Sequence, residues 1–136
     1  MVLDTSALVA LLELEPGAPL LQKALARDPN RLVSAATLLE TSMVIESRHG
    51  EAGGRELDLL LARAQVEIVP VTAEQVALAR HAFRKFDKGR HPARLNFGDC
   101  FSYALSRLSG EALLYQGEDF SKTDVVSALA EGLASG

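Results

Sequence analysis

The chain has 136 residues, the length of one ordinary domain, and its 48% hydrophobic and 24% charged content excludes a disordered, collagen-like or low-complexity protein. The single cysteine, Cys100, excludes an internal disulfide framework and favours a reducing compartment. A net charge of -4 and an aromatic content of 5% argue against a protein that binds nucleic acid by stacking bases on aromatic side chains. Because no targeting or membrane-spanning segment is visible, we expect a cytoplasmic protein.

Short apolar runs alternate with helical periodicity along the chain. The expected elements, in chain order, are a strand at 2–3, helices at 5–13 and about 20–28, a strand at 31–34, helices at 35–48 (closed by Gly50) and 55–65, a strand at 66–71, helices at 72–86 and 99–108, and a strand at 112–115. Residues 123–128 should form either a last strand or an irregular edge. This alternation predicts an α/β fold with a mostly parallel sheet.

We expect a single domain, because no linker is long enough to divide the chain. Its predicted limits are residues 1–130, with 131–136 as a frayed tail.

Four acidic residues occupy positions that such a sheet could bring to one edge. Asp4 ends the first strand, Glu40 lies early in the helix after the second strand, Asp99 opens a helix, and Asp119 follows the last clear strand. Clustered carboxylates raise one another's pKa values, so a site of four needs a cation. Oxygen-only ligands suit Mg²⁺ or Mn²⁺, ions that clamp phosphoryl oxygens and activate water.

Each of these acids also has a purely structural interpretation, and spacing alone does not show that the four converge. Asp4 suits the start of a helix, where the helix dipole stabilises an acid. Asp99 suits a helix N-cap, and Glu40 fits a capping box with Thr37. Asp119 could satisfy a turn.

Other kinds of reactive site find little support. The three histidines show no metal-ligand pairing, and Cys100 lies beside the acid Asp99, which disfavours a reactive thiolate. No glycine-rich phosphate-binding loop is present. The segment Asp4-Thr5-Ser6 also lacks the second acid that an aspartyl-phosphate phosphatase would carry at position 6.

A basic segment precedes Asp99. Residues 80–94 contain six Lys or Arg residues and one acid, so this window carries +5 and the remainder of the chain about -9. Most charged segments are solvated helix faces. A basic flank beside an acidic metal site is also what a phosphodiester-cleaving enzyme needs, because cations hold the phosphate backbone.

Four segments together resemble the PIN-domain ribonucleases and, more narrowly, the VapC toxins of VapBC toxin–antitoxin pairs. They are Val2-Leu3-Asp4-Thr5-Ser6-Ala7-Leu8, Glu40 in its helix, Leu95-Asn96-Phe97-Gly98-Asp99-Cys100-Phe101, and Gly117-Glu118-Asp119-Phe120-Ser121-Lys122-Thr123-Asp124. The resemblance implies a PIN-like three-layer sandwich with a central, mostly parallel sheet flanked by helices. It also implies Mg²⁺-dependent cleavage of RNA, with Mn²⁺ as a substitute, by a homodimer that a small VapB-like antitoxin wraps and inhibits.

The same resemblance assigns roles to individual residues. Asp4 and Asp99 correspond to metal ligands, with Glu40 as the third catalytic acid and Asp119 as the fourth. Glu118 and Asp124 are close enough in sequence to compete with Asp119 for the fourth position. Thr5 or Ser6 would orient the carboxylates or a metal-bound water. The expected RNA contacts within the basic segment are Arg84, Lys85, Lys88 and Arg90.

The leading hypothesis is therefore a toxic, metal-dependent endoribonuclease of a type II toxin–antitoxin system. One alternative is a catalytically silent PIN-like binding module in which the acids only cap helices. The complete set of four acids disfavours that module. Another alternative is a small metal-dependent phosphatase, and the basic segment disfavours it by favouring a polymeric substrate.

Overall fold

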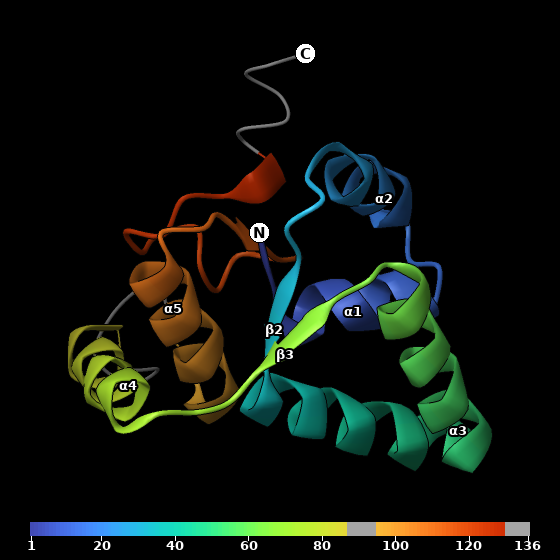
Figure 1. Cartoon of the computed structure of the whole chain (residues 1–136), viewed down its shortest axis with the longest axis horizontal. Helices are drawn as coiled ribbons and strands as arrows, with labels where there is room; N and C mark the ends of the chain where they lie inside the picture. The colour runs from blue at the N-terminus through green and yellow to red at the C-terminus, as the bar shows by residue number, and fades with distance from the viewer. Residues whose placement is uncertain (87–94, 130–136) are drawn as a thin grey trace.

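The computed structural model describes residues 1–86 and 95–129, within which it has five helices and a four-stranded sheet (Figure 1). The elements are β1 (Val2–Leu3), α1 (Thr5–Leu12), α2 (Ala18–Arg27), β2 (Leu32–Ser34), α3 (Ala35–Arg63), β3 (Glu67–Val69), α4 (Ala73–Phe86), α5 (Phe97–Ser109) and β4 (Leu113–Leu114). The strand order is β3-β2-β1-β4 and every pairing is parallel. The predicted α/β fold is thus confirmed.

The sheet lies between two layers of helices, as Figure 1 shows. Residues from α1, α2 and the second half of α3 form one core with Leu3, Val33 and Leu114 of the strands. Residues from α4 and α5 form a second core with Val2 and Leu113. Because successive strand residues face opposite sides, β1, β2 and β4 each supply both cores, whereas β3 contributes only Val69, to the second core. Strands buried on both faces explain the uninterrupted apolar runs in the sequence.

The boundaries of α3 and β3 differ from those predicted. Helical structure continues on both sides of Gly50, whose φ of 68° and ψ of -165° break the helix and make a kink, so the two predicted helices form one bent element. Strand β3 is shorter than predicted and covers only the residues that pair with the three residues of β2; it lies at the edge of the sheet, and its Ile68 is 49% exposed. In the segment 123–128, one bridge joins Ser127 to Leu113, so this segment is an irregular edge.

Helix α5 begins two residues earlier than predicted. Its N-cap is Asn96, whose side chain accepts a hydrogen bond from the amide of Asp99. Both faces of this helix are buried, because Ser102 and Ser106 are as inaccessible as Ala104 on the apolar side. The polar face of α5 therefore packs inside the protein, with Ser102 beside Asp4 at the carboxyl edge of the sheet and Ser106 bonded to the Glu111 carbonyl just before β4.

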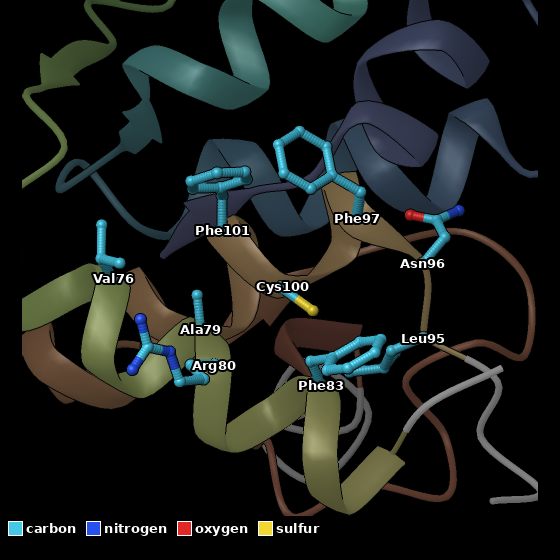
Figure 2. Close-up of a pocket in the computed structure, with 9 residues that line it drawn as sticks. All are labelled: Val76, Ala79, Arg80, Phe83, Leu95, Asn96, Phe97, Cys100 and Phe101. Atoms are coloured by element: carbon cyan, nitrogen blue, oxygen red, sulfur yellow. The ribbon is translucent and has the colours of Figure 1, made fainter. Parts of the chain in front are cut away.

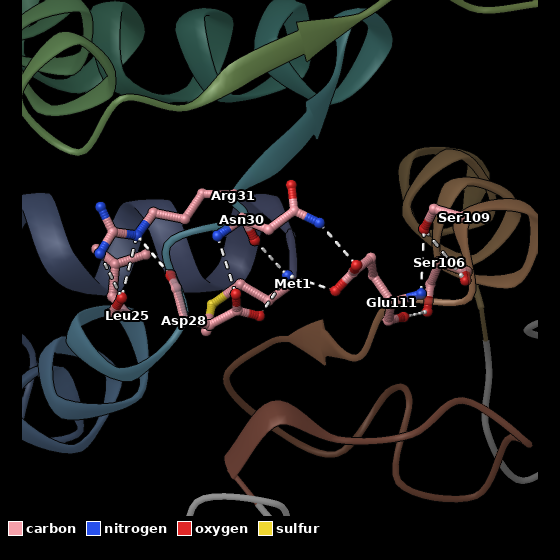
Figure 3. A network of polar contacts seen from close by, with 8 residues as sticks. All are labelled: Met1, Leu25, Asp28, Asn30, Arg31, Ser106, Ser109 and Glu111. Atoms are coloured by element: carbon pink, nitrogen blue, oxygen red, sulfur yellow. Dashed lines mark hydrogen bonds and ion pairs between the residues drawn. The ribbon is translucent and has the colours of Figure 1, made fainter.

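Polar contacts hold the opposite end of the sheet, where the strands begin (Figure 3). The Met1 ammonium group pairs with Asp28 at 2.9 Å and with Glu111 at 3.0 Å. The Arg31 guanidinium donates to the carbonyls of Leu25, Asp28 and Ala64, which lie at the ends of α2 and α3. These contacts join the helix ends to the amino edge of the sheet. None of them involves side chains at the carboxyl edge.

Among the described helices, none combines the length and hydropathy needed to cross a membrane. The predicted tail 131–136 lies outside the described residues, and the domain limits at 1–130 stay a prediction.

Candidate active site

The four predicted acids lie around one cleft at the carboxyl edge of the sheet. Asp4 follows β1, Glu40 lies in the second turn of α3, Asp99 lies in the first turn of α5, and Asp119 follows β4. All four line a cavity of about 360 Å³. Spacing alone could not show this convergence, and the parallel topology produces it.

Asp4 is the most deeply placed of the four, with 2% of its surface exposed. One carboxylate oxygen, Oδ2, accepts hydrogen bonds from the Ser6 amide at 3.0 Å and from the Ser6 hydroxyl at 2.6 Å. The other, Oδ1, accepts from the Ser102 hydroxyl at 2.6 Å. Burial raises the pKa of Asp4, while the bonds from Ser102 and Ser6 favour its ionised form. Asp4 is also the N-cap of α1, so it has the predicted structural role and lines the cleft as well.

Asp99 is the third residue of α5, and the N-cap is Asn96, so the interpretation of Asp99 as an N-cap is wrong. Its Oδ2 accepts from the Asn96 amide at 3.0 Å, which completes a capping box. Burial raises the pKa of Asp99 to about 7, with further contributions from the charges of Asp4, Asp119 and Glu40. Asp99 is therefore the acid whose ionisation the other three carboxylates oppose.

Glu40 does not form a capping box with Thr37, because α3 begins earlier, at Ala35, with Ser34 as its N-cap. Its Oε1 accepts a hydrogen bond of 2.6 Å from the Thr5 hydroxyl. The rest of the carboxylate packs directly over Gly98, where a Cβ atom would collide with it. Glycine at position 98 therefore makes room for Glu40 beside Asp99.

Among the acids after β4, Asp119 alone lines the described cleft. Asp124 instead accepts a 2.8 Å hydrogen bond from the Tyr103 hydroxyl and lies near Lys85 and Arg107. The adjacent turn is held by the Glu118 carbonyl, which accepts from the amide and the hydroxyl of Ser121. This placement favours Asp119 as the fourth acid.

Two of the four predicted RNA contacts fall on described residues. Arg84 and Lys85 are exposed in the last turn of α4. The Lys85 ammonium lies 3.9 Å from Asp124 and 5.1 Å from the centre of the Phe86 ring. Lys88 and Arg90 lie outside the described residues.

The donors around the cleft fit a hard divalent cation. They are carboxylate oxygens, the ligands that Mg²⁺ and Mn²⁺ prefer. Over residues 1–86 and 95–129, no ion pair joins these four acids to a Lys or Arg, and Arg48 at the cleft pairs with Glu13 instead. In the same ranges, no three ligating side chains are close enough to share a metal as they stand. The acids surround the cleft without forming a closed metal cage.

A second, apolar cleft of about 460 Å³ lies between α4 and α5 and shares Asn96 with the acidic one. Figure 2 shows its lining, in which Phe83 of α4 lies opposite Leu95 and the Cys100 sulfur points between the two helices. Its lining residues are Val76, Ala79, Arg80, Phe83, Leu95, Asn96, Phe97, Cys100 and Phe101. This lining contains no carboxylate, so the candidate metal-binding and catalytic groups are those of the acidic cleft.

Sequence reasoning missed a layer of buried hydroxyls beneath the acids. Thr37 is 1% exposed, and Thr41 and Ser102 are 0% exposed. The available signal was spacing: Ser102 is three residues after Asp99, and Thr37 and Thr41 are one helical turn apart. Asn96 is the N-cap of α5, a role that the sequence pattern does not single out, because Asp99 is an equally suitable N-cap by residue type.

A family model relates this chain to PIN-domain proteins, and its curated relatives are named VapC ribonucleases. The PIN domain family model matches residues 1–126. Ribonuclease VapC of Mycolicibacterium smegmatis is 60% identical, with 93% of this chain and 98% of that protein covered. Ribonuclease VapC30 of Mycobacterium tuberculosis is 56% identical, with 93% and 97% covered.

Solved structures show the same fold. Mycobacterium tuberculosis VapC20, described as a toxin that cleaves the sarcin–ricin loop, matches with a TM-score of 0.72 at 24% identity over 92% of this chain and 95% of that one. A chain of VapBC2 from Rickettsia felis, solved with a DNA fragment from its promoter, matches with a TM-score of 0.72 at 16% identity over 93% and 94%.

Proposed function

The chain belongs to the PIN-domain family, and from that premise we propose that it is the toxin of a type II toxin–antitoxin pair, an endoribonuclease that hydrolyses phosphodiester bonds in RNA. The observation that carries this proposal is the convergence of Asp4, Glu40, Asp99 and Asp119 on one cleft. The relatives that share more than half of its sequence are named ribonucleases, which supports the same activity.

The proposed cofactor is Mg²⁺, with Mn²⁺ as a substitute. Asp4 and Asp99 would hold the ion, with Glu40 and Asp119 completing the acidic surroundings. When bound, such an ion polarises phosphoryl oxygens and lowers the pKa of a coordinated water. The chain's own contribution is orientation: Ser6 fixes Oδ2 of Asp4, Thr5 fixes Oε1 of Glu40, and the capping box fixes Asp99.

Binding of the RNA backbone is the proposed role of Arg84, Lys85, Lys88 and Arg90. Their charges would offset the repulsion between an acidic cleft and a polyanion. Arg84 is exposed and free to reach a phosphate, whereas Lys85 would exchange its distant contact with Asp124 for one with RNA.

The proposed partners are a cognate VapB-like antitoxin and a second copy of the chain. Large apolar side chains exposed near the cleft are typical of surfaces that other proteins cover. Leu39 is 62%, Met43 64% and Phe97 81% exposed. A cytoplasmic location, where RNA is present and Cys100 stays reduced, completes the proposal.

The direct test is incubation of the purified protein with single-stranded RNA in Mg²⁺, in Mn²⁺ and in EDTA. We expect internal cleavage that EDTA abolishes. A small phosphate ester serves as a parallel substrate, and its turnover in the absence of RNA cleavage would favour a phosphatase. Binding of RNA without cleavage in either metal would favour a silent binding module.

A further inference from the structure

Two hydroxyl groups, one behind the other, form a hydrogen-bonded chain that ends at the Asp4 carboxylate. Ser102 donates to Oδ1 of Asp4 at 2.6 Å, and the Thr37 hydroxyl lies 3.2 Å from the Ser102 oxygen. Thr37 comes from α3 and Ser102 from α5, so this short chain links two helices to the residue that ends β1. Thr37 and Ser102 are 1% and 0% exposed, so both contacts are buried inside the protein.

The direction of these hydrogen bonds follows from the chemistry of the groups. An ionised carboxylate only accepts hydrogen bonds, so the Ser102 proton points to Asp4. The Ser102 oxygen is then available to accept, and Thr37 donates to it. The order is therefore Thr37 to Ser102 to Asp4, in which each donor polarises the next.

The Asp4 carboxylate has a donor on each oxygen, from opposite sides. Ser6 holds Oδ2 and Ser102 holds Oδ1. Removing the Ser102 hydroxyl would leave Oδ1 of Asp4 without its donor, so that only Ser6, through its amide and hydroxyl on Oδ2, would orient the carboxylate. Partners that fix a ligating carboxylate in this way commonly affect metal affinity tenfold or more.

We propose that Ser102, supported by Thr37, is a positioning residue that orients Asp4 toward the divalent ion. This inference rests on the proposed function, since it concerns the same carboxylate. The role of Thr37 is indirect and passes through Ser102, which distinguishes it from residues that contact Asp4 themselves.

A matched control is present on the same helix. Ser106 is 4% exposed, lies one turn beyond Ser102, and donates a 2.7 Å hydrogen bond to the Glu111 carbonyl. A Ser106→Ala change therefore removes an equally buried hydroxyl without affecting the acids. Thr37→Ser provides the conservative variant, because it retains the hydroxyl and removes only a methyl group.

The test is calorimetric titration of the metal-free, full-length protein with Mn²⁺, beside its melting temperature and RNA cleavage. We expect Ser102→Ala to weaken Mn²⁺ binding about tenfold. Thr37→Val should weaken it several-fold in the parent and not at all in a Ser102→Ala background. Thr37→Ser should bind as the parent does, and Ser106→Ala should melt earlier with unchanged affinity for Mn²⁺.

Parental Mn²⁺ affinity in Ser102→Ala overturns the proposal, and so does a Thr37→Val effect of equal size in both backgrounds. If Ser102→Ala does not fold, Thr37→Val decides alone, and parental affinity in that variant overturns the proposal. RNA cleavage by the parent distinguishes failure of the positioning role from failure of the proposed function. A parent that cleaves RNA while Ser102→Ala binds Mn²⁺ normally refutes the positioning role only, whereas a parent that neither binds Mn²⁺ nor cleaves RNA refutes both.

Discussion

Replacing Asp99 by Asn should stabilise the metal-free protein at alkaline pH while abolishing cleavage. Asp99 is 7% exposed and faces three other acids, so its negative charge is costly in the folded state. Asn has nearly the same shape and can still accept the hydrogen bond from the Asn96 amide. The substitution thus removes the charge and leaves the capping box in place.

The size and sign of this effect follow from the pKa of Asp99. Burial, reinforced by its acidic neighbours, raises this pKa from 3.8 to about 7, so between these values the native state binds more protons than the unfolded chain. The parent therefore loses stability as the pH rises through this window, and the loss is complete above pH 7. The difference corresponds to about 4 kcal/mol. Because water in the open cleft screens the charges, we expect roughly half of this, about 2 kcal/mol.

Urea denaturation in EDTA at pH 4 and pH 8 measures this difference. The parent and Asp99→Asn should be equally stable at pH 4, and the variant should be more stable at pH 8. Asp99→Ala loses the capping bond as well and should be about 1 kcal/mol less stable than Asp99→Asn at both values. Equal pH dependence of stability in the parent and Asp99→Asn would refute the raised pKa.

Three further predictions concern metal, RNA and packing. Mg²⁺ at ten times its dissociation constant should stabilise the parent by about 1.4 kcal/mol and Asp99→Asn by less, which thermal unfolding measures; equal stabilisation of both would place the ion elsewhere. Replacing Arg84, Lys85, Lys88 and Arg90 together by Ala should flatten the plot of the logarithm of the RNA-binding constant against the logarithm of salt concentration. Its slope should fall by about 0.7 per lost contact, and an unchanged slope would exclude this segment from the RNA interface. Gly98→Ala should displace the Glu40 carboxylate and reduce cleavage with little change in melting temperature, because the group it meets is the end of a flexible side chain; parental activity would show that the position of Glu40 is unimportant.

The fold could be predicted from the sequence because its signals are local. The apolar pairs Val2-Leu3 and Leu113-Leu114 stand out between helical segments, and Gly50 marks the bend in α3. The residues at which helices and strands begin and end were less predictable. The cap of α5 depends on a reciprocal contact between Asn96 and Asp99, and Asp99 by itself has the composition of an N-cap.

The four acids could be identified as candidates from their positions along the chain. The side chains that surround each acid could not be predicted in the same way. The spacing of Thr37 and Glu40 fits a capping box, the structural alternative for Glu40, whereas the hydroxyl that donates to Glu40 is that of Thr5, on another helix. Ser102 illustrates the same limit. Its contact with Asp4 joins residues 98 positions apart, and only the parallel topology brings the two together.

The most direct test of the central claim, that this acidic cleft hydrolyses RNA, is single-turnover cleavage of a labelled single-stranded RNA by the parent and by Asp4→Asn. RNA affinity is measured in EDTA for both proteins. We expect a rate at least about a hundredfold lower for Asp4→Asn, with RNA affinity equal to or slightly above that of the parent, because the lost charge supports chemistry and repels the substrate. Cleavage by Asp4→Asn at the parental rate would contradict the central claim.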